Sequence, residues 1–267
     1  MTEQTRLRYT APVDEKPLEH LVSDGGYTSI FRRIACVGDS LSSGEHESLN
    51  PDGTNGYHDL FEHSWGQYLA RMTGATVFNF SGGGMMASTY CNGHAEAMGW
   101  LDPEKWAQAY IIALGVNDIV NYNQAPGTVA DICDENLAKN AETFTGYYAR
   151  IIQTYKQISP DAKFFLVTPP IHPTHAEMGL SGRFAVVTNC VYALADYFGT
   201  YVIDLYRYAP AHSGAYVDTF YLHHHLNAAG YRVAAEQMAS YIDYIIRHHP
   251  QDFKNVGFIG SKTPMLC

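Results

Sequence analysis

The segment at positions 32–40 has the sequence RRIACVGDS, in which a short apolar run passes directly into a glycine and two polar residues. A continuous apolar run of this length is typical of a strand buried on both faces, and the Gly-Asp-Ser after it is typical of a tight turn. Four more segments have the same character, at 75–80, 109–114, 163–167 and 201–205. The sequence therefore predicts five buried strands.

Longer segments with helical spacing separate these strands. The predicted helices lie at 61–72, 135–158, 176–198 and 228–247, and the apolar side chains of each recur every three or four residues. Strands that alternate with helices indicate a parallel sheet covered on both faces. We therefore expect an α/β fold, a single-domain three-layer α/β/α sandwich around a five-stranded, mostly parallel sheet.

The two ends of the chain lack a clear periodic pattern of apolar residues. Residues 1–30 mix charge, proline and glycine, and we expect them to form an N-terminal arm over the domain. Residues 31–249 then form one domain, since no repeat or linker interrupts them. The tail at 250–267 contains Phe253, Val256 and Phe258, which must be covered by this domain or by a neighbouring molecule. The oligomeric state is left open, with a homo-oligomer as one option.

Composition excludes several classes of partner. The 267 residues include 17 basic and 27 acidic side chains, for a net charge of −10. Phosphate binding needs an excess of Lys and Arg, so nucleic acid is not an expected partner. No apolar run approaches the ~20 residues that span a bilayer, and no secretory signal precedes the domain. We expect a cytoplasmic protein without a membrane partner.

The five cysteines lack paired spacing and predict neither a disulfide framework nor a four-cysteine zinc site.

Ligands of a parallel sheet bind outside the carboxyl ends of its strands. Three predicted strands end there in small or polar residues: Gly38-Asp39-Ser40, Ser81-Gly82-Gly83-Gly84 and Gly115-Val116-Asn117-Asp118. A serine on such a turn can act as a nucleophile beside backbone N–H groups that stabilise the oxyanion, and the Asn117 amide can donate to the same oxyanion. Taken alone, Ser40 is better explained as a turn or helix-cap residue, and Asn117 as part of a turn with Asp118.

The glycines at 82–84 also fit a loose dinucleotide-binding pattern that ends at Ala87. This loop follows the second strand rather than the first, and no acidic residue ends a strand about 20 residues later. The sequence therefore predicts no nicotinamide cofactor. Close approach of the backbone to a small anionic group explains the glycines better.

Three adjacent histidines, His223, His224 and His225, precede the last predicted helix. Adjacent side chains point in different directions, whereas zinc ligands favour spacings such as i, i+4, so no metal site is predicted. One alternative is a surface loop that leads to a helix capped by Asn227. Another is that one histidine is the base that a Ser40 nucleophile needs. A metal-dependent hydrolase that uses all three histidines is a third hypothesis.

Taken in order, these motifs resemble the GDSL, or SGNH, hydrolase family. The segments GDSLS (38–42), NFSGGG (79–84), GVND (115–118) and HLNAAGY (225–231) are similar to the family's blocks I, II, III and V. The resemblance implies the flavodoxin-like SGNH hydrolase fold and an esterase or acylhydrolase. It further implies Ser40 as the nucleophile and His225 as the general base, with an oxyanion hole formed by the N–H groups of Ser40 and Gly84 and by the Asn117 side chain.

Two positions within this resemblance are open. The choice of Gly84 rests on its spacing of five residues from Asn79, and Gly83 is the alternative. The family's aspartate three residues before the histidine is replaced here by Leu222. The group that orients His225 is then Asp218 or a backbone carbonyl.

The implied reaction is two-step acyl transfer through an acyl-enzyme on Ser40, without a metal or organic cofactor. We expect a small-molecule or glycan ester with a short acyl chain as the substrate, and a carbohydrate O-deacetylase as one form of this activity. Tyr57 near the motifs is a candidate pocket residue, whereas Trp65 is better explained by packing on the sheet. The alternatives are a lysophospholipase or thioesterase of the same family, or a catalytically weak binding protein, which the leucine at 222 would explain.

Overall fold

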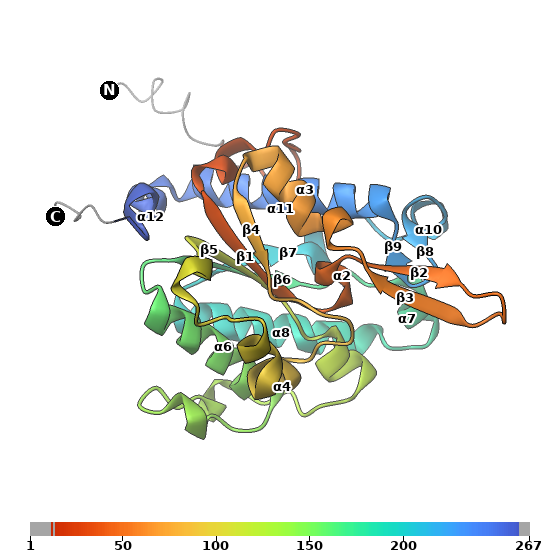
Figure 1. Ribbon diagram of the computed structural model, residues 1–267, viewed down its shortest axis with the longest axis horizontal. Helices are drawn as coiled ribbons and strands as arrows, with labels where there is room; N and C mark the ends of the chain where they lie inside the picture. Colours follow the sequence, from red (N-terminus) through yellow and green to blue (C-terminus); the bar gives the residue numbers. More distant parts are fainter. Residues whose placement is uncertain (1–11, 13, 262–267) are drawn as a thin grey trace.

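The structure is a computed structural model and describes residues 12 and 14–261 (Figure 1). Its centre is a five-stranded sheet with the order β4-β1-β5-β6-β7, in which every pair of neighbours is parallel. The strands are β1 (Arg33–Gly38), β4 (Thr76–Asn79), β5 (Ala109–Ala113), β6 (Lys163–Thr168) and β7 (Tyr201–Asp204). The predicted α/β fold and all five predicted strands are confirmed.

Helices cover both faces of this sheet, as Figure 1 shows. The helices α3 (Trp65–Thr73) and α11 (Ala228–His248) lie on one face, and α6 (Phe144–Ile158) and α8 (Ser181–Phe198) lie on the other. Successive residues of β1 alternate between the two apolar cores: Ile34 and Cys36 pack toward α11, whereas Ala35 and Val37 pack toward α6. This alternation is the pleat of a strand buried on both sides.

Three predicted helices are shorter than their apolar pattern suggests. The α-helix of segment 61–72 starts only at Trp65, after the Ser64 cap. The segment 135–158 has a short 3-10 turn at Leu137–Lys139 and becomes α-helical only at Phe144, where the Thr143 hydroxyl accepts a hydrogen bond from Gly146 N (3.1 Å) and caps the first turn of α6. The segment 176–198 is divided into α7 (Pro173–Glu177) and α8, since Gly179 between them has a φ of 75° and cannot continue a right-handed helix.

Two antiparallel hairpins were not predicted. They pair β2 (Glu45–Leu49) with β3 (Asn55–Asp59), and β8 (Tyr221–Leu222) with β9 (His225–Leu226). The first projects from the carboxyl edge of the sheet (Figure 1). Both lack apolar alternation, so hydrophobic periodicity cannot reveal them. The remaining short helices are α2 (Ser40–Ser43), α4 (Ala87–Thr89), α5 (Ala95–Ala97), α9 (Leu205–Tyr208), α10 (Gly214–Phe220) and α12 (Pro250–Phe253).

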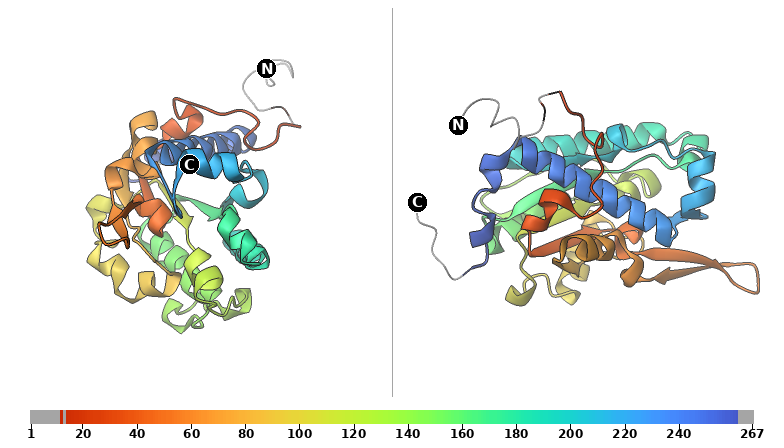
Figure 2. Two further views of the ribbon diagram at one scale, coloured as in Figure 1. Left: turned by 90° about the vertical axis from the view of Figure 1, so that its right-hand side faces the viewer. Right: turned by 90° about the horizontal axis from the view of Figure 1, so that it is seen from above.

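The described parts of both chain ends contact the domain. The N-terminal segment crosses α11, where Val22 N donates to Ser240 Oγ at 2.8 Å (Figure 2, right). At the other end, α12 places the Phe253 ring against the Phe165 ring of β6, with a centroid separation of 6.3 Å. Among the described residues, no helix has the length and apolar character needed to cross a membrane.

Candidate active site

Ser40 is the first residue of α2 and lies two residues after Gly38, the last residue of β1. Asp39 caps this short helix, because its Oδ1 accepts a hydrogen bond from Leu41 N at 3.0 Å. A Cβ on Gly38 would lie 2.2 Å from Ser42 Oγ, so only glycine allows a turn this tight. The turn therefore holds Ser40, which is partly exposed, at the edge of the sheet where the sequence predicted a ligand.

The glycine loop lies beside this turn. Gly82 N donates to Gly38 O at 3.2 Å, which ties the loop after β4 to the end of β1. Gly84 has a φ of 65° and is exposed, and open space surrounds the position of a Cβ there. A Cβ on Gly83 would instead lie 2.4 Å from Glu45 Oε2, so a carboxylate rests against that glycine.

Asn117 and Asp118 fasten the same loop to the end of β5. Asn117 Nδ2 donates to Met85 O at 3.1 Å, and Asp118 Oδ1 accepts from Ala87 N at 2.8 Å. Met85 O is the one acceptor that this amide reaches among the described residues, and the amide has a second N–H. Burial raises the pKa of Asp118 to about 7, and that of Asp39 to about 6. The structure thus brings together the three segments that carry Ser40, Gly84 and Asn117.

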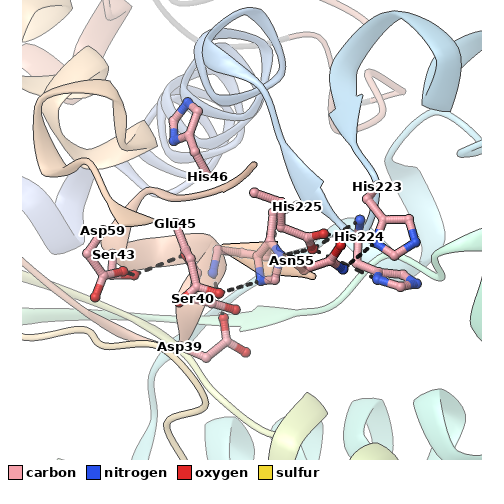
Figure 3. Close-up of polar contacts among 12 residues, drawn as sticks. Asp39, Ser40, Ser43, Glu45, His46, Asn55, Asp59, His223, His224 and His225 are labelled. Atoms are coloured by element: carbon pink, nitrogen blue, oxygen red, sulfur yellow. Dashed lines mark hydrogen bonds and ion pairs between the residues drawn. The ribbon is translucent and has the colours of Figure 1, made fainter. Parts of the chain in front are cut away.

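His225 is the first residue of β9 and lies between two carboxylates of the β2–β3 hairpin. Figure 3 shows His225 beside one of them, Glu45. Its Nδ1 lies 2.5 Å from Glu47 Oε1, and its Nε2 lies 3.0 Å from Glu45 Oε1. Residues 45 and 47 of a strand face the same side, which explains why one strand supplies both carboxylates. Tyr231 of α11 donates to Glu45 O at 2.6 Å and so fixes the base of this hairpin.

Glu47 is the more buried of the two carboxylates, with a side chain only 3% exposed. Burial acts to raise the pKa of Glu47, but hydrogen bonds from His225 and His223 outweigh it and hold that pKa below its usual value. A carboxylate on Nδ1 holds the imidazole in the tautomer whose Nε2 can accept a proton. Glu47 is therefore placed to orient His225.

Glu45 contacts Nε2, the other ring nitrogen of His225. Its Oε1 contacts His225 Nε2, and its Oε2 occupies the space that a Cβ on Gly83 would need, so the carboxylate lies between the histidine and the glycine loop. Burial raises the pKa of Glu45, and the nearby His225 opposes this shift. Among the described residues, no hydrogen bond joins Ser40 Oγ to His225. In the structure Glu45, rather than Ser40, is the partner of His225 Nε2.

The group on His225 Nδ1 is neither of the two that the sequence suggested. Asp218 lies on α10 and is exposed, and a glutamate rather than a backbone carbonyl accepts from the ring. Leu222 pairs with His225 across the β8–β9 turn and is exposed as well. The missing aspartate was the reason to consider a catalytically weak protein, and Glu47 removes that reason.

A sequence signal for Glu47 existed but is weak. The segment GEHES at 44–48 alternates two acidic residues with other residues, and NPDG at 50–53 is typical of a turn. Together they describe a polar hairpin with Glu45 and Glu47 on one face. Nothing in this pattern indicates which distant residue that face meets.

Comparisons with known proteins identify the family and the fold of this chain. A five-stranded parallel sheet with these motifs at its carboxyl edge defines an α/β protein of the SGNH hydrolase fold. The model of the GDSL-like lipase/acylhydrolase family matches residues 36–233, and the chain belongs to that family. It is accordingly a hydrolase of ester bonds. No curated protein matches the chain.

Three solved structures illustrate the shared fold. A protein from Lactobacillus plantarum is 19% identical with a TM-score of 0.57, covering 80% of this chain and 97% of its own. A family two carbohydrate esterase from Clostridium thermocellum, in complex with cellohexaose, is 17% identical with a TM-score of 0.56, covering 88% and 67%. The acetyl xylan esterase AlAXEase is 19% identical with a TM-score of 0.52, covering 79% and 99%.

Proposed function

We propose that the protein is a serine esterase that cleaves short-chain carboxylic esters through an acyl-enzyme on Ser40. The observation that carries this proposal is the 2.5 Å contact between His225 Nδ1 and Glu47, at the sheet edge where Ser40 also lies. A histidine held by a buried carboxylate is the base that a serine nucleophile requires.

In the proposed reaction, Ser40 Oγ attacks the carbonyl carbon of the ester while His225 Nε2 takes the hydroxyl proton. Glu47 stabilises the imidazolium that forms. The N–H groups of Ser40 and Gly84 and the second N–H of the Asn117 amide donate to the oxyanion. The alcohol leaves with the proton from His225, and water then hydrolyses the acyl-enzyme by the same route.

Replacing Asn117 with alanine removes one donor to the oxyanion. We expect kcat for p-nitrophenyl acetate to fall about 100- to 1000-fold with little change in KM, because the amide serves the transition state more than the ground state. Asn189 is exposed on α8, and its replacement with alanine is the matched control. A loss below about threefold in the Asn117 variant would exclude the amide from the oxyanion hole.

The surroundings of His225 favour a polar alcohol such as a sugar. Tyr57 is 56% exposed, and the centroid of its ring lies 6.0 Å from that of the His225 ring in an edge-on arrangement. Asn55 and His223 add polar groups near His225, with Asn55 Nδ2 3.2 Å from His223 Nδ1. An exposed aromatic ring among hydrogen-bonding side chains suits a carbohydrate. Trp65, in contrast, is buried in the core, as its apolar spacing suggested. We therefore propose carbohydrate O-deacetylation as the preferred activity.

A panel of substrates tests this proposal. Rates on p-nitrophenyl esters from C2 to C12 and acetate release from acetylated xylan are measured with the wild type and with Ser40→Ala. We expect rates that peak at the shortest chains, acetate release from the polysaccharide, and neither activity in the variant. A maximum at C8 or longer, or activity only on lysophospholipids or thioesters, would contradict a short-chain deacetylase.

A further inference from the structure

Glu47 has a second group of contacts that the esterase mechanism does not use. Its Oε2 lies 2.8 Å from His223 Nδ1, and its Oε1 lies 3.8 Å from His224 Nδ1. One ligand atom from each of these three residues lies within 4.8 Å of the other two. The carboxylate is buried, whereas the His223 and His224 side chains are 58% and 44% exposed. A buried anion therefore faces two imidazoles that solvent can reach.

The turn between β8 and β9 explains why two adjacent histidines converge. His223 and His224 are its two central residues, and His223 has a φ of 62°. Glycine is the usual residue at the first central position of such a turn, so a histidine there is held at an energetic cost. The left-handed backbone brings the two rings side by side, with centroids 3.8 Å apart. The expectation that adjacent side chains point apart fails at this turn.

We propose that Glu47, His223 and His224 form a Zn²⁺ site that switches the esterase off. One carboxylate and two imidazoles are a known zinc donor set, which leaves a fourth position for water. Zn–N and Zn–O bonds of about 2.0–2.2 Å place tetrahedral ligand atoms about 3.3 Å apart. The exposed imidazoles need only a small rotation to reach that spacing from their present positions.

Zinc would act on catalysis by competing with His225 for the Glu47 carboxylate. Glu47 uses the same two oxygens to accept from His225 Nδ1 and to face His223 and His224. Coordination draws this carboxylate toward the two histidines and away from His225, so the base loses the group that orients it. This regulatory step rests on the proposed esterase function, whereas the binding of the metal does not.

Zinc binding is measured by competition with a chromophoric zinc chelator, using the full chain. We expect one Zn²⁺ per chain in the wild type, and affinity at least about 100-fold lower in the double variant H223G/H224G. Glycine suits the left-handed position, so this variant should fold, and far-UV circular dichroism checks that it does. The adjacent histidines His248 and His249 provide the matched control as H248A/H249A. Equal zinc affinity in all three proteins would overturn the site.

Ester hydrolysis tests the switch. We expect Zn²⁺ to inhibit the wild type and the H248A/H249A control, and a chelator to restore both. The H223G/H224G variant should keep its own metal-free rate at the same zinc concentration. Zinc that binds the wild type at these residues without slowing hydrolysis would overturn the switch. If the metal-free protein hydrolyses no ester, the binding measurement still decides the site, and it is the proposed function that fails.

Discussion

Replacing Ser40 with alanine should lower kcat/KM for p-nitrophenyl acetate by about 10⁴- to 10⁶-fold, the largest effect that we expect from any single substitution. The proposed mechanism has no second nucleophile, and the remaining oxyanion donors accelerate only direct attack by water. A fluorophosphonate probe should add one adduct to the wild type and none to the variant, as intact mass shows.

Ser213 supplies the control for this experiment. It is exposed before α10 and makes no capping hydrogen bond through its side chain, so Ser213→Ala should keep the wild-type rate. A Ser40→Ala variant that retains more than about a tenth of the wild-type rate would assign the reaction to another residue. Equal background rates in wild type and variant would instead support a binding protein with this fold.

Replacing Glu47 with glutamine should lower kcat by about 10³- to 10⁴-fold. The amide keeps the size of the side chain, but its NH₂ group can donate to His225 Nδ1 and so stabilise the tautomer that cannot accept a proton at Nε2. Glu47→Asp keeps the charge on a shorter side chain and should retain more activity than the glutamine variant. All rates are measured with a metal chelator present, so that any loss reflects the orientation of His225.

Asp218→Asn is the decisive comparison, since Asp218 is the acid that the sequence suggested for this role. We expect it to leave kcat unchanged, because this side chain is exposed on α10. A large loss in Asp218→Asn together with a small loss in Glu47→Gln would reverse the assignment. Thermal unfolding of both variants separates a loss of fold from a loss of catalysis, which matters because Glu47 is buried.

The sequence by itself determined the sheet and the three motifs at its edge. The three central strands, β1, β5 and β6, are continuous apolar runs that are buried on both faces, so local composition and burial agree there. Ser40, Gly84 and Asn117 come shortly after β1, β4 and β5, and parallel strands place their carboxyl ends at one edge. Helix boundaries were predicted less accurately. Thr143 caps the N-terminus of α6 later than the apolar pattern suggests, and the left-handed Gly179 interrupts the segment 176–198.

Only the tertiary structure decided which carboxylate holds His225 and where the three histidines point. Glu47 and His225 are 178 residues apart, and Glu47 lies on a hairpin without an apolar pattern, so no local signal joins them. The convergence of His223 and His224 on the same glutamate depends on one left-handed residue in a two-residue turn. Apolar burial is a local property that periodicity records, whereas a polar contact depends on the direction and distance between groups, which the whole fold must bring together.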